Sequence, residues 1–152
     1  MSQELLLMLH PTFGILGLIA AVWVFVETLN VTDGNHARII GASKLVTVLM
    51  WLAYIVGGYW YVVHYGSDKA LIKAGPWSFS HSFFMETKEH VFLMLILLAT
   101  FLPIAASGDM VGRAATRTLV LWSSGLIVLM TLAMEGAGAF ISMGVKAALL
   151  AN

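Results

Sequence analysis

The feature that most constrains this chain is a set of four apolar stretches, which cover about residues 5–30, 39–65, 89–106 and 119–143. An α-helix of about 20 apolar residues crosses a hydrocarbon core of about 30 Å. Only helices and closed barrels satisfy their backbone polar groups in lipid, and these stretches are too long for barrel strands. We therefore expect an all-α fold, an integral membrane four-helix bundle that forms a single transmembrane domain over residues 1–152.

The composition supports this class and excludes several others. Of the 152 residues, 60% are hydrophobic and only 11% are charged, and the formal net charge is +0. A polybasic surface for nucleic acid therefore has no support, and membrane lipid is the expected surrounding. The chain has no cysteine, which excludes disulfides, thiolate metal sites and covalently attached c-type haem.

Ionisable side chains gather at one end of the expected spans. When the chain is threaded back and forth across a bilayer, five of them fall towards the same face: His10, His64, His81, His90 and Glu135. Carboxylates and imidazoles are costly in hydrocarbon, so a spanning helix keeps them where a partner helix, a metal or water meets them. We expect the functional site on this face.

The third span brings carboxylates and an imidazole together. Glu86 and His90 are four residues apart, so they lie on one helical face about one turn apart, and Glu89 is adjacent to His90. His64 and His90 are the first ligand candidates, because both lie on long spans at a similar depth. His10, near the start of the first span, is the third candidate.

Two kinds of cofactor suit these side chains. Haem iron accepts an axial histidine on each face, so the first hypothesis is a b-type haem bound by two of His10, His64 and His90. A non-haem metal ion, with copper as the leading candidate, is the alternative. Its ligands would come from His64, His90, His10, Glu86 and Glu135. Six glycines near the same face could make room for a macrocycle, although small residues at four-residue spacing are also common in membrane bundles without a cofactor. They are Gly14, Gly17, Gly57, Gly58, Gly136 and Gly138.

Three other residues receive structural interpretations. His81 lies in the segment between the second and third spans, where we expect a water-exposed histidine. Pro11 predicts that the first helix is broken or capped near that point, because proline lacks the N–H donor. Glu27 lies near the other end of the first span, and we expect it to reach water or to pair with Lys44 or Arg38.

Membrane orientation depends on the basic residues, which divide evenly between the two sides. The two short links hold all three arginines close to span ends, which favours placing these links inside and both chain termini outside. In a bacterial inner membrane the histidine-rich face would then be periplasmic.

Several segments resemble a known family. They are Asn35-His36-Ala37-Arg38, Trp51-Leu52-Ala53-Tyr54, Val63-His64-Tyr65, Glu89-His90-Val91 and residues 98–103. Together they resemble the CtaM/YozB-like family of small four-helix membrane proteins, some of which are linked to assembly of haem-copper oxidases. That family usually has a further histidine entering its last span, where this chain has Arg113 and Arg117. The resemblance thus implies a site on the His64 and His90 face. A looser resemblance, to b561-like cytochrome b anchors, lies in the four helices and the imidazoles.

Three functions follow as hypotheses. The first is a membrane redox protein or subunit that binds one b-type haem near one face and exchanges electrons with quinol or a partner protein. The second is a copper site in a haem-copper oxidase assembly or metal-handling protein, and the third is a cofactor-free structural subunit of a larger membrane complex. No nucleophile triad or phosphate loop is evident, so an electron carrier or complex subunit is favoured over an independent enzyme.

Overall fold

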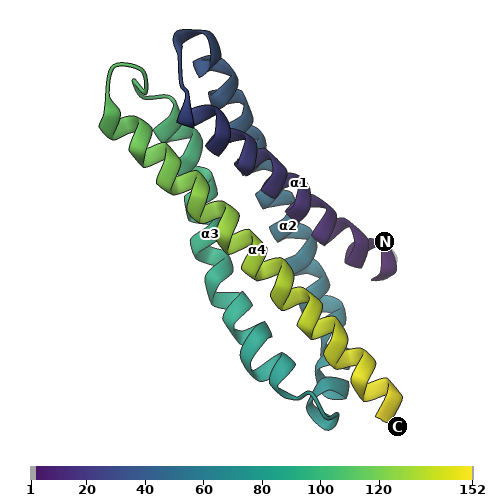
Figure 1. The fold of residues 1–152 in the computed structure, drawn as a ribbon. Coiled ribbons are helices and arrows are strands. Elements are labelled where there is room, and N and C mark those ends of the chain that lie inside the picture. The colour runs from purple at the N-terminus through teal and green to yellow at the C-terminus, as the bar shows by residue number, and fades with distance from the viewer. Residues whose placement is uncertain (1–2, 152) are drawn as a thin grey trace.

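The protein is a bundle of four long helices (Figure 1). The structure, a computed structural model, describes residues 3–151. The helices are α1 (Gln3–Leu29), α2 (Asp33–Ala74), α3 (Glu86–Ala106) and α4 (Ala114–Ala151), and a π-helical turn, η1 (Ser80–Met85), leads directly into α3. Neighbours in the chain pack together, and α4 closes the bundle against α1. No strand occurs between residues 3 and 151, which confirms the all-α prediction, and all four helices are long and apolar enough to cross a membrane.

The core of the bundle follows one stripe on each helix. On α3 the buried residues Leu95, Ala99 and Leu102 recur at alternating spacings of four and three, and they pack with Val46 of α2 and Ile127 of α4. Large apolar side chains also cover the outer surface of every helix. A helix that is apolar on all sides is typical of a membrane span.

The short links close one end of the bundle with polar contacts. The Arg38 guanidinium donates to Glu27 Oε1 at 2.7 Å, and the Trp23 indole donates to the same oxygen at 2.8 Å. This confirms that Glu27 pairs with a basic residue of the second helix. At the start of α2, Thr32 and Asn35 form a capping box, which satisfies backbone N–H groups that the first turn leaves without a partner.

Pro11 does not interrupt the first helix. The prediction of a break or cap near this residue was wrong, because α1 runs without interruption from Gln3 to Leu29 with Pro11 inside it. Next to the proline, the Thr12 hydroxyl donates to the Met8 carbonyl at 2.7 Å, the bond that a helical threonine makes with the carbonyl four residues earlier.

The other end of the bundle extends farther than the expected spans. α2 continues to Ala74 and α4 to Ala151, and the segment expected to link the second and third spans is helical except at Gly75 to Ser78. A second apolar cluster of Tyr65, Ile72, Met85 and Ile141 holds this extension together. At 1.5 Å per residue α2 is about 63 Å long, which is roughly twice what a hydrocarbon core requires. Figure 1 shows that α1 ends short of this extension, so its outer part is built from α2, η1 and α4.

Candidate functional site

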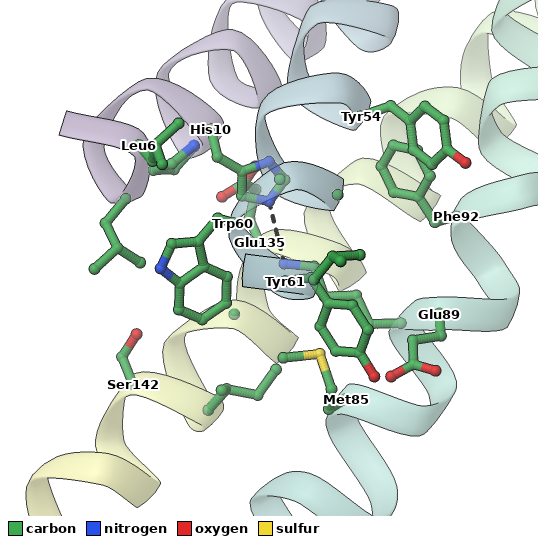
Figure 2. A pocket seen from close by; sticks show the side chains of 18 of the residues that line it. Leu6, His10, Tyr54, Trp60, Tyr61, Met85, Glu89, Phe92, Glu135 and Ser142 are labelled. Atoms are coloured by element: carbon green, nitrogen blue, oxygen red, sulfur yellow. Dashed lines mark hydrogen bonds between the residues drawn. The ribbon is translucent and has the colours of Figure 1, made fainter. Parts of the chain in front are cut away.

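A cavity of about 630 Å³ lies among the four helices where α1 begins. Its walls are largely apolar and include four aromatic rings, those of Tyr54, Trp60, Tyr61 and Phe92 (Figure 2). The rings of Tyr54 and Phe92 stack with centroids 5.0 Å apart and planes 16° from parallel. Concave apolar cavities with a few convergent polar groups are the usual form of a small-molecule site.

Three ionisable side chains from three helices meet in this cavity: His10 of α1, Lys88 of α3 and Glu135 of α4. We call them the polar triad. Counted from the short-link end of each helix at 1.5 Å per residue, they lie roughly 27–32 Å along the bundle, so they share one level. All three side chains are half-buried. The matched depth is what brings groups from distant parts of the sequence together.

His10 is held in a defined orientation. Its Nδ1 lies 2.8 Å from the carbonyl oxygen of Ala53, and because a carbonyl can only accept, Nδ1 carries the proton. The neutral ring then has an acceptor at Nε2, and this atom lies 3.5 Å from Lys88 Nζ, as the dashed line in Figure 2 shows. The lysine ammonium donates and the imidazole accepts. His10 therefore presents a basic nitrogen to the cavity.

Glu135 balances the charge of Lys88. The two side chains are close enough to attract each other electrostatically across the gap between α3 and α4. A charge removed from water is tolerated mainly when a partner of opposite charge or a hydrogen bond compensates it. The polar triad thus combines a cation, an anion and a neutral base within one cavity wall.

Each member of the triad lies over a glycine of another helix. A methyl group at Gly57 would meet the His10 ring, one at Gly14 would meet Glu135 Oε1, and one at Gly138 would lie 3.3 Å from Lys88 Nζ. The absence of side chains at these three positions makes room for the polar groups.

A second polar pair lies on the cavity wall formed by α2 and α3. The Tyr61 hydroxyl points towards the Glu89 carboxylate in Figure 2, and the two groups interact electrostatically. Both residues line the cavity, and Glu89 is also exposed at the surface of the bundle.

The structure does not bring His64 and His90 into this cavity. His90 is exposed, and its Nδ1 lies 2.7 Å from the Glu86 carbonyl of its own helix. His64 lies seven residues beyond Gly57, about 10 Å farther along α2, where its ring is 6.3 Å from that of Tyr59. Within residues 3–151 there is no group of three or more histidine and acidic side chains placed to hold a metal ion. Of the residues predicted as ligands, the cavity collects only His10 and Glu135.

His81 is buried, contrary to the prediction of a water-exposed histidine. Its exposed fraction is 1%, its Nδ1 lies 3.0 Å from the Tyr65 hydroxyl, and its Nε2 lies 3.6 Å from Glu86 Oε1. The prediction failed because the segment expected to be a wet link is the π-helix η1, which packs against α4.

Lys88 is the site residue that sequence reasoning missed. Lys88 lies on one helical face with Phe92 and Leu95, since residues four and seven apart share a face. His90 has the same relation to the apolar residues Met94 and Leu97, so spacing alone does not distinguish the two positions.

The cavity can therefore hold an amphiphilic molecule whose ring lies among the aromatic side chains. Its polar atoms would face a hydrogen-bond donor, a hydrogen-bond acceptor and a carboxylate, the groups of the polar triad. Such a cluster can also accept and return protons, because imidazole and carboxylate groups change their protonation readily. No protein family model, curated protein or solved structure matches this chain.

Proposed function

We propose that this chain is an integral membrane protein that binds a quinone or quinol in the cavity and exchanges its electrons with a partner redox protein. The observation that carries the proposal is the polar triad, which gathers His10, Lys88 and Glu135 in an apolar, aromatic-lined cavity. Ionisable groups on membrane spans are expensive and mark substrate, ion or proton pathways. A quinone has the matching form, a flat polar ring on an apolar tail.

The chemistry of the triad suits both redox forms of such a ligand. The Lys88 ammonium can donate to a quinone carbonyl oxygen. The unprotonated Nε2 of His10 can accept from a quinol hydroxyl when that hydroxyl replaces Lys88 as its donor. Oxidation of a quinol releases two electrons and two protons. His10 and Glu135 are the groups placed to take the protons, and the electrons pass to the partner protein.

Quinone titration tests the proposal. Decylubiquinone added to the purified protein in detergent should quench tryptophan fluorescence, because Trp60 forms part of the cavity wall. His10→Ala should raise Kd about tenfold or more, since a hydrogen bond in a buried site is lost. His64→Ala is the matched control and should bind like the wild type. Absence of binding by the wild type, or equal binding by the two variants, would refute this assignment.

A b-type haem in the same cavity is the second candidate, and the geometry of His10 is the observation that favours it. A histidine that ligates a metal commonly donates its other ring nitrogen to a carbonyl, and His10 Nδ1 does so to Ala53. In this case the purified, reduced protein would show the sharp absorption bands of a b-type haem. His10→Ala would abolish them, whereas His90→Ala would not. In this second proposal His10 ligates the haem, in place of His64 and His90.

We also propose that the protein resides in a bacterial inner membrane with the cavity on the outer side, as the arginines of the two short links favour. The chain has no cysteine, so single cysteines report topology without a background signal. In intact cells a membrane-impermeant maleimide should label Ser67→Cys on the extension and leave Ser107→Cys, in a short link, unlabelled. The reverse pattern would show that the orientation is wrong.

A further inference from the structure

Protons released inside the cavity need a way out, and Glu89 has the position for it. Its side chain lines the cavity and is also exposed at the surface. The members of the polar triad are half-buried, and each is tied to a partner within the bundle. Of the four cavity-lining residues that carry an imidazole, ammonium or carboxylate group, Glu89 is thus the one that is also exposed at the surface.

Tyr61 lies beside Glu89 on the cavity wall and can act as a second proton-transfer group. Its hydroxyl points towards the Glu89 carboxylate in Figure 2, and both side chains line the cavity. A phenol can donate one proton while it accepts another, so it can pass a proton onward without keeping a charge.

A second set of hydrogen-bonded polar side chains near the cavity is less suited to carrying protons. His81 is hydrogen-bonded to Tyr65 and paired with Glu86, but none of these three residues lines the cavity. The Tyr65 ring contacts two residues of the cavity wall, Tyr61 with centroids 5.2 Å apart and Trp60 with centroids 5.5 Å apart. Stacked rings do not transfer protons.

We propose that Glu89, together with the Tyr61 hydroxyl, carries protons between the cavity and the exterior, an inference that rests on the proposed quinol site. A proton that leaves the triad passes to the Glu89 carboxylate, either directly or through Tyr61, whose own hydroxyl proton moves on as the new one arrives. The carboxylic acid then releases its proton to water. Only O–H and N–H bonds form and break, so no further reactant is needed.

Proton exchange at Lys88 tests the route in the resting protein. In a sample labelled with ¹⁵N at lysine Nζ, the exchange of the Lys88 ammonium protons with water is measured by NMR, and Lys88→Arg identifies the signal. Glu89→Gln should slow this exchange about tenfold or more, because a positioned proton-transfer group contributes at least that much. Tyr61→Phe should slow it in the same direction.

Glu86→Gln is the matched control, because Glu86 lies three residues earlier on the same helix, is exposed, and does not line the cavity. It should leave the exchange rate at the wild-type value. Unchanged exchange in Glu89→Gln, or equal slowing in Glu86→Gln, would overturn the proposal.

Decylubiquinone titration of the same samples separates the two ideas. If the wild type binds no quinone, the proposed function fails while the exchange rates still decide the role of Glu89. If the wild type binds quinone and exchange is unaffected by Glu89→Gln, only the proton route fails.

Discussion

Gly57→Ala is the substitution that most directly tests the geometry of the cavity. The added methyl group would lie 2.6 Å from Cε1 and 3.1 Å from Cγ of His10, as well as close to Nδ1. Carbon atoms in ordinary contact are about 3.5 Å apart or more, so the ring must move by about 1 Å. A shift of that size is enough to break the 2.8 Å hydrogen bond from Nδ1 to the Ala53 carbonyl.

Gly58→Ala is the control that isolates this effect. Both glycines lie inside α2 and line the cavity, and a methyl group at Gly58 meets nothing within 4 Å. Each substitution gains about 1 kcal/mol from the higher helix propensity of alanine, so this contribution cancels between them. The remaining difference is the clash with His10 and the lost hydrogen bond, for which overpacking costs suggest about 1–3 kcal/mol.

The assay is unfolding of the two variants by sodium dodecyl sulfate in mixed micelles, followed by circular dichroism. Gly57→Ala should unfold at lower detergent fraction than Gly58→Ala, and its affinity for decylubiquinone should fall because His10 has moved. Equal free energies of unfolding in the two variants would show that His10 does not lie against Gly57, and the description of the site would then be wrong.

Two further predictions concern the surroundings of the cavity. Gly14→Ala forces the flexible end of Glu135 aside, so quinone affinity should fall several-fold. The control is Gly136→Ala, whose added methyl group meets nothing within 4 Å, and the two variants should have similar stability. Equal quinone affinity in the two variants would contradict the placement of Glu135. Tyr65→Phe removes the hydroxyl that is hydrogen-bonded to Nδ1 of the buried His81. The free energy of unfolding, measured by the same dodecyl sulfate titration, should fall by about 1–3 kcal/mol. An unchanged value would show that this hydrogen bond does not stabilise the extension.

The fold was predictable because four apolar stretches leave a chain few alternatives. The ends of the helices were harder to place, because the extension beyond the apolar stretches is held by tertiary contacts. Tyr65 and Ile72 are buried there by residues more than ten positions away in the sequence, Met85 and Ile141. The segment carries lysines, serine and glycine, and its local sequence pattern does not predict this packing.

The identity of the site residues depended on the rotation of α3, which the sequence left open. Successive helical residues turn by about 100°, so Lys88 and His90 point to nearly opposite sides. Lys88 continues the buried stripe of Leu95 and Leu102, whereas His90 continues a stripe in which Leu97 is 72% exposed. Since α3 is apolar on both sides, its pattern could not tell the inner face from the outer one. Counting residues along the helix therefore predicted the depth of the site in the membrane but not which face of α3 contributes to it.

The glycines show how a cofactor-sized site differs from plain helix packing. A methyl group at Gly17 would meet the side chain of Met50, with Cε at 2.8 Å, so Gly17 serves the apolar contact of α1 with α2. Gly14, one turn earlier, instead makes room for the Glu135 carboxylate, and Gly57 makes room for the His10 ring. Packing alone gives no reason to set polar side chains over glycines, because an apolar side chain would fill the same space without the cost of burying a polar group. The quinone or quinol that we propose for the cavity would supply that reason.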